Sequence, residues 1–87
     1  MSIEPADALG ALAGTLTTAA FVPQVLKTWK SGSAKDISFA MFLIFSIGVL
    51  LWLVYGILIG ATPIIFANSV TLVLALAILV MKIRFKK

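Results

Sequence analysis

The stretch from Ile37 to Met81 reads ISFAMFLIFSIGVLLWLVYGILIGATPIIFANSVTLVLALAILVM and contains no charged residue. As one α-helix it would extend roughly 68 Å, at about 1.5 Å per residue, whereas the hydrocarbon core of a bilayer is about 30 Å thick. The stretch is therefore expected to cross a membrane twice. The turn is expected at residues 60–63 (GATP), because Gly60 can end one helix, Thr62 can N-cap the next, and Pro63 suits its first position.

A second uncharged stretch, Ala8 to Leu26, precedes this one and is long enough for a third span. The 87 residues are 62% hydrophobic and 11% charged, with a mean hydropathy of +1.19. A soluble fold of this size could not bury so much apolar surface. We predict an all-α membrane protein, one domain over 1–87, with spans at approximately 7–28, 37–59 and 63–83.

Charge placement predicts the orientation of these spans. The N-terminal tail carries Glu4 and Asp7 and no basic residue. All basic residues lie in the first loop or the C-terminal tail: Lys27, Lys30, Lys35, Lys82, Arg84, Lys86 and Lys87. The positive-inside rule then places the N-terminus outside the cell and the C-terminus in the cytoplasm.

The first span contains features that change helix geometry. Pro23 removes a backbone donor and clashes with the carbonyl of Ala19, so a kink is expected, with the polar Gln24 beside it. Gly10 and Gly14 form a pattern of small residues that lets helices approach closely. Simple helix packing explains both features equally well, since proline and glycine are common in membrane helices.

Two polar or amphipathic side chains lie at comparable depth in the other spans. Trp52 and Asn68 are each less than about two helical turns from the outer end of their span. An indole face can stack on the C–H faces of a sugar, and an amide can bond its hydroxyls. The alternatives are core packing for Trp52 and interhelical hydrogen bonding for Asn68.

The missing residue types exclude several functions. The chain has no cysteine and no histidine, and no Asp, Glu, Lys or Arg lies within the stretches 8–26 and 37–81. We therefore expect no enzyme activity, no metal and no other cofactor. The basic residues flank lipid rather than form a folded face, which argues against nucleic-acid binding. The same absence of intramembrane charge favours passive movement of an uncharged solute.

Several motifs occur in an order that resembles a known family. They are Phe21-Val22-Pro23-Gln24-Val25, Asp36-Ile37-Ser38, Met41, Gly48, Trp52-Leu53-Val54-Tyr55-Gly56 and Ala67-Asn68-Ser69-Val70-Thr71. This set resembles the bacterial SemiSWEET sugar transporters of the SWEET and PQ-loop families. The resemblance implies a three-helix bundle with the third helix between the first and second. It also implies a parallel homodimer that works by alternating access.

The resemblance also implies roles for individual residues. They are sugar contacts at Trp52 and Asn68, a hinge at Pro23 and Gln24, an outer gate at Tyr55, and an inner gate at Met41 and Phe45. Some family members place an arginine and an aspartate after the tyrosine, where this chain has Ile59 and Ala61. Outer closure would then depend on Tyr55 and apolar contact.

The expected function is facilitated diffusion of a mono- or disaccharide, of the glucose or sucrose class, across a bacterial inner membrane. Two alternatives remain open. One is a PQ-loop transporter of another small solute, such as an amino acid. The other is a holin-like pore former or a subunit that only packs.

Overall fold

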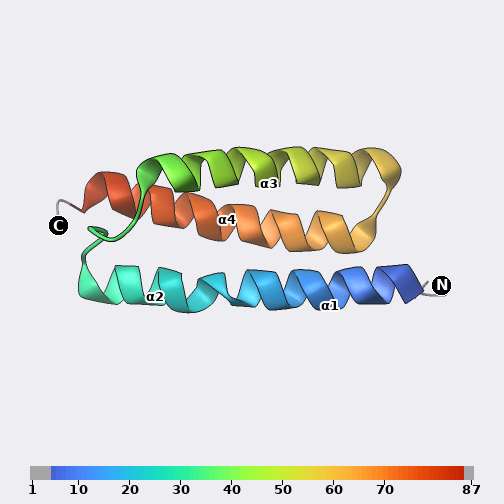
Figure 1. The fold of residues 1–87 in the computed structure, drawn as a ribbon, viewed down its shortest axis with the longest axis horizontal. Helices are drawn as coiled ribbons and strands as arrows, with labels where there is room; N and C mark the ends of the chain where they lie inside the picture. Colours follow the sequence, from blue (N-terminus) through green and yellow to red (C-terminus); the bar gives the residue numbers. More distant parts are fainter. Residues whose placement is uncertain (1–4, 86–87) are drawn as a thin grey trace.

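A computed structural model describes residues 5–85, so Glu4, Lys86 and Lys87 lie outside the described part of the chain. The helices are α1 (Pro5–Ala19), α2 (Phe21–Ser31), α3 (Phe39–Ile59) and α4 (Thr62–Arg84) (Figure 1). Because α1 and α2 follow one another almost without interruption, the structure contains three candidate membrane spans: Pro5–Ser31, Phe39–Ile59 and Thr62–Arg84. The expected all-helical architecture of three long apolar helices is confirmed.

The interruption between α1 and α2 falls at Ala20, which lies in a turn but keeps backbone angles of φ −62° and ψ −24°. Pro23 explains its position. Its ring nitrogen carries no hydrogen, so the carbonyl of Ala19 loses the donor that a regular helix would supply four residues later. The two segments run end to end in Figure 1, so the proline interrupts the helix without reversing the chain.

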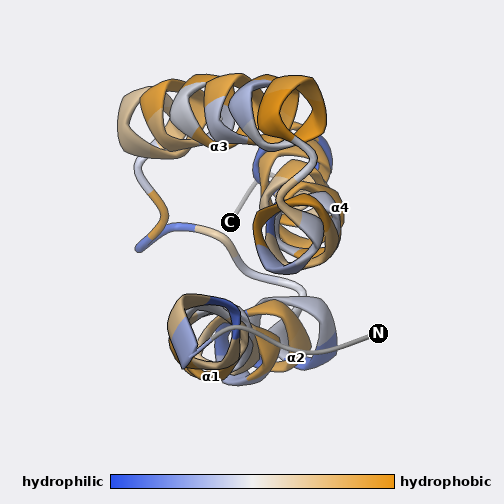
Figure 2. Ribbon diagram, turned by 90° about the vertical axis from the view of Figure 1, so that its right-hand side faces the viewer, coloured by the Kyte–Doolittle hydropathy of each residue, from blue (hydrophilic) through white to orange (hydrophobic). Residues whose placement is uncertain are grey.

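Helix α4 lies between the other two spans, as expected from the resemblance (Figures 1 and 2). α1, α2 and α4 run in the same direction and α3 runs in the opposite direction. Viewed along the bundle in Figure 2, α4 lies to one side of α3 and α1–α2. The bundle therefore has a convex side, formed by α4, and an opposite concave side, where α3 and α1–α2 are not separated by α4.

Glycines allow α4 to approach both neighbours closely. A Cβ atom built on Gly14 would lie 2.6 Å from Cβ of Ala67, and one built on Gly10 would lie 3.7 Å from Cβ of Pro63. The small-residue pattern of the first span therefore packs α1 against α4 within one copy of the chain. On the other side of α4, a Cβ on Gly56 would lie 2.7 Å from Cγ2 of Ile64.

Helix α4 starts one residue earlier than the sequence predicts. Gly60 ends α3 in the left-handed conformation, with φ 69°, as expected. Helix α4, however, begins at Thr62, and its N-cap residue is Ala61, which has no side-chain hydrogen bond to offer. Thr62 is therefore not the N-cap, because the extended conformation that a cap requires falls on Ala61.

Polar contacts hold the helices together at two levels. Near the middle of the bundle, the hydroxyl oxygens of Thr18 and Thr71 lie 2.6 Å apart, and Thr18 also donates to the carbonyl of Ala67 at 3.3 Å. At the C-terminal end, Lys82 donates to the carbonyl of Ala34 at 2.9 Å. The second contact ties α4 to the loop between α2 and α3.

A hydrophobic core lies at this same end of the bundle. Its buried residues come from the α2–α3 loop, α3 and α4, and are Ala34, Ile37, Phe42, Ile78 and Leu79. The loop is thus packed rather than loose, although it carries Lys35 and Asp36 as exposed charges. The rest of the bundle buries few side chains, since its apolar surface is suited to lipid.

Candidate functional site

Trp52 projects from α3 with 57% of its surface exposed. Its indole meets the ring of Tyr55 edge to face, with centroids 5.5 Å apart. Together with Gly48 and Leu51, these two rings line a shallow, open pocket of about 360 Å³. Gly48 contributes no side chain, which leaves the indole face accessible one turn towards the C-terminal end of the bundle.

Asn68 projects from α4 and is partly buried. Its Nδ2 donates to the carbonyl of Ile64, one turn earlier, at 2.9 Å. This bond uses one of the two N–H donors of the amide and fixes the direction of the side chain. The other donor and the carbonyl oxygen are the groups that a ligand hydroxyl could engage.

The contact between Gly56 and Ile64 sets the relative depth of Trp52 and Asn68. Trp52 lies four residues before Gly56, and Asn68 lies four residues after Ile64. Because α3 and α4 are antiparallel, both positions lie one turn further along the same seam, in the same direction. The structure thus brings Trp52 and Asn68 to similar depth on either side of one helix contact.

The two residues do not enclose a site within one copy. The pocket beside Trp52 is lined by α3 alone and does not include Asn68. Both Trp52 and Tyr55 are about half exposed, at 57% and 48%. A closed cavity around a solute would need further walls.

Aromatic residues gather near the other end of the spans. Phe21 of α2 stacks on Phe45 of α3, with centroids 5.0 Å apart and planes at 28°, and meets Phe42 edge to face at 6.1 Å. Met41, one turn from Phe45, is 57% exposed. The sequence motif contained Phe21, but no role was expected for it. Its position two residues before Pro23 was the available signal.

The residues around the proline combine exposure with an internal hydrogen bond. Pro23 is exposed and Gln24 is partly buried. The buried hydroxyl of Thr28 donates to the backbone carbonyl of Gln24 at 2.8 Å. This bond supports α2 on the C-terminal side of the proline, whereas the N-terminal side has lost the bond to Ala19. The interruption is therefore local.

The C-terminal half of α3 carries Tyr55 and Ile59, both exposed. Ala61 follows in the turn and is partly buried. Within residues 5–85 no three His, Cys, Asp or Glu side chains lie close enough to hold a metal ion. The side chains at this end could close a path by apolar contact.

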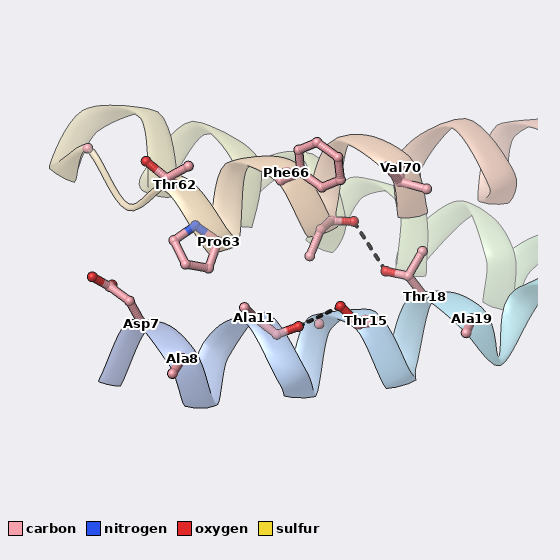
Figure 3. Close-up of a pocket in the computed structure, with 13 residues that line it drawn as sticks. Asp7, Ala8, Ala11, Thr15, Thr18, Ala19, Thr62, Pro63, Phe66 and Val70 are labelled. Carbon is pink, nitrogen blue, oxygen red and sulfur yellow. Dashed lines mark hydrogen bonds between the residues drawn. The ribbon is translucent and has the colours of Figure 1, made fainter. Parts of the chain in front are cut away.

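A larger groove lies elsewhere, between α1 and the first half of α4 (Figure 3). Its volume is about 810 Å³, and neither Trp52 nor Asn68 lines it. Figure 3 shows Phe66 and Val70 on its α4 side, and Ala11, Thr15 and Thr18 on its α1 side. The groove and the pocket beside Trp52 thus share no lining residue.

Residues 6–65 match the PQ-loop repeat family. The chain is 51% identical over 77 residues to the sugar transporter SemiSWEET of Bradyrhizobium diazoefficiens, covering 88% of this chain and 90% of that protein. It is 47% identical over 75 residues to the sugar transporter SemiSWEET of Leptospira biflexa, covering 86% and 88%. The chain belongs to the SemiSWEET family.

Solved structures agree with this assignment to the SemiSWEETs. The crystal structure of a bacterial homologue of SWEET transporters matches with a TM-score of 0.88 and 45% identity, over 94% of this chain and 99% of that one. A SemiSWEET in the inward-open conformation matches with a TM-score of 0.85 and 35% identity, over 94% and 88%. The family resemblance is confirmed, and with it the expectation of a membrane-embedded transporter rather than an enzyme.

Proposed function

We propose that this SemiSWEET carries an uncharged sugar, of the glucose or sucrose class, across the membrane as a parallel homodimer. The observation that carries the proposal is the arrangement of Trp52 and Asn68. They flank one helix seam at similar depth, and together they offer an aromatic face and an amide. The names of the relatives as sugar transporters support the same substrate class.

The need for a second copy follows from the open geometry of one bundle. Trp52 and Tyr55 are about half exposed, and their pocket has walls from α3 only. A second chain in the same orientation would face the first across the concave side and supply another indole and another amide. Two half-sites would then enclose a solute that one copy cannot surround.

Alternating access requires the path to open at one end while it closes at the other. Pro23 and Gln24 are the proposed hinge, because the helix has lost a hydrogen bond there. Phe21, next to this point, would transmit a movement of α2 to Phe45, which together with Met41 would close the cytoplasmic end. Tyr55 would close the other end by apolar contact with its counterpart.

Transport is proposed to be passive. The stretches 8–26 and 37–81 contain no Asp, Glu, Lys, Arg or His, so no proton-binding carboxylate lies in these stretches to couple flow to a gradient. The basic residues that the structure describes all lie at one end of the bundle, which contains the α2–α3 loop and the C-terminal end of α4. This end is proposed to face the cytoplasm of a cell with this protein in its inner membrane.

Uptake by proteoliposomes tests the proposal. Vesicles containing the protein should accumulate labelled sucrose or glucose faster than empty vesicles, and an imposed proton gradient should not change the rate. Trp52→Ala and Asn68→Ala should each remove most of the uptake and leave the dimer intact. Leu58→Ala, at an exposed position of the same helix as Trp52, is the matched control and should transport normally.

The same vesicles separate the alternatives. If labelled amino acids enter and sugars do not, the protein transports another solute. If a large trapped dye escapes, the protein forms a pore rather than a carrier. Absence of sugar uptake above empty vesicles would refute the proposal.

A further inference from the structure

The groove between α1 and α4 has the dimensions of a binding site within one leaflet of a bilayer. Along α1 it extends from Asp7 to Ala19, roughly 18 Å at about 1.5 Å per residue. Half of a hydrocarbon core of about 30 Å is about 15 Å. Its volume of about 810 Å³ falls in the range of about 300–1,000 Å³ that is usual for small-molecule sites.

The walls of the groove suit a hydrocarbon chain. Alanine and glycine form much of the α1 side, and Phe66 and Val70 form the α4 side (Figure 3). Three threonines line the groove, and Thr62 lies at its mouth; the hydroxyls of the other two, Thr15 and Thr18, are already hydrogen-bonded within the protein. Thr15 donates to the carbonyl of Ala11 at 2.7 Å, and Thr18 pairs with Thr71 at 2.6 Å. An acyl chain between Ala11 and Val70 therefore meets no hydroxyl that lacks a partner.

The mouth of the groove differs from its interior. Asp7 lies there, beside the start of α4 at Thr62 (Figure 3). This end of the bundle is the one without basic residues among those described, so the carboxylate gives it a negative charge. A primary ammonium in a lipid headgroup would complement Asp7 by its charge and its N–H donors, whereas an anionic headgroup would be repelled.

We propose that this groove binds one phospholipid whose headgroup carries a primary ammonium, with an acyl chain between α1 and α4 and the ammonium at Asp7. The groove shares no lining residue with the pocket beside Trp52, so the proposed lipid and the proposed sugar do not compete for the same side chains. A lipid bound there contacts both α1 and α4 where Gly14 and Ala67 touch. It stabilises this helix pair on the N-terminal side of the break at Ala20.

Native mass spectrometry of the purified full chain tests this site. Phosphatidylethanolamine should bind about tenfold more tightly than phosphatidylglycerol or phosphatidylcholine. Asp7→Asn should remove this preference. Ala11→Phe, which fills the groove, should weaken phosphatidylethanolamine binding about tenfold, and the neighbouring Leu12→Phe, outside the groove, should not. Equal binding of the three lipids, or equal effects of the two phenylalanines, would overturn the proposal.

A second experiment needs no variant and is independent of folding defects. The wild-type protein is reconstituted in vesicles with a photoactivatable phosphatidylethanolamine that carries a diazirine on its acyl chain. Peptide mapping should find the crosslinks at Phe66 and Val70 in preference to Ile44 and Ile57 of α3, which are both more than half exposed. Uniform labelling of these residues would contradict a defined site. If Ala11→Phe instead changes the oligomeric state, the groove is a protein interface and the proposal fails.

Discussion

Gly56 of α3 touches Ile64 of α4 so closely that no side-chain carbon fits between the two helices at this point. A Cβ on Gly56 would lie 2.7 Å from Cγ2 and 3.2 Å from Cβ of Ile64. The contact fixes the spacing of the helices one turn from Trp52 and Asn68. Any substitution that widens it changes the distance between the two proposed sugar contacts.

Gly56→Ala is therefore expected to lower both stability and transport. The added methyl group should cost about 1–3 kcal/mol of unfolding free energy, because α3 and α4 must separate to admit it. Sugar uptake should fall as Trp52 and Asn68 move apart. Thermal unfolding in detergent and uptake by proteoliposomes measure the two effects. Gly48→Ala is the stability control, since a Cβ there meets nothing within 4 Å; equal unfolding temperatures for the two variants would contradict the packing account.

Pro23→Ala should slow transport without destabilising the fold. Alanine restores the N–H that can reach the carbonyl of Ala19, so α1 and α2 should merge into a regular helix. A stiffer helix should lower the uptake rate, and the unfolding temperature should stay the same or rise. Pro63→Ala is the matched control, because Pro63 lies in the first turn of α4, where its missing donor is not needed. Normal uptake by Pro23→Ala would exclude a hinge at this position.

The hydroxyl pair of Thr18 and Thr71 should show measurable coupling. Replacing either residue with valine keeps the shape and leaves the other hydroxyl without its partner. The double variant should then be less destabilised than the sum of the two single variants, with a coupling of about 0.6–1.7 kcal/mol. Unfolding in mixed micelles gives the four free energies. Strict additivity would show that the contact of 2.6 Å contributes nothing.

Lys82→Met should loosen the loop between α2 and α3. The ammonium donates to the carbonyl of Ala34, which is buried, so its loss leaves that carbonyl without this bond. Limited proteolysis should cut residues 32–38 faster than in the wild type. Lys35→Met removes an exposed lysine from the loop itself and should not accelerate cleavage at other peptide bonds of the loop. Unchanged cleavage in Lys82→Met would show that the core around Ala34 holds the loop without the lysine.

The sequence predicts most of this fold because lipid constrains it strongly. The span lengths follow from the absence of charge. The turn at Gly60 follows from the residue type, because glycine adopts the left-handed conformation seen there without steric cost. The interruption of the first span follows from Pro23. The break at Ala20 itself needs the structure, since the sequence only limits it to the turn before the proline.

The candidate site is less predictable. Depth along a span can be counted, which places Trp52 and Asn68 at the same level. The direction in which a side chain points around the helix axis depends on packing. Spans that are hydrophobic on every side have no polar face from which this direction could be predicted. The stack of Phe21 on Phe45 and the reach of Lys82 to Ala34 depend on that packing. So does the separation of the α1–α4 groove from the pocket beside Trp52.

The short turn between α3 and α4 has a consequence for how the chain enters the membrane. With only Gly60 and Ala61 between them, and with Gly56 against Ile64, these helices can insert as a hairpin soon after synthesis. The first span is made earlier, is less apolar and carries four threonines, and its main partner is α4, which is made after α3. Its final docking therefore waits until α4 has been synthesised. Mutations that weaken the α1–α4 contact should then appear as losses of assembled protein in cells.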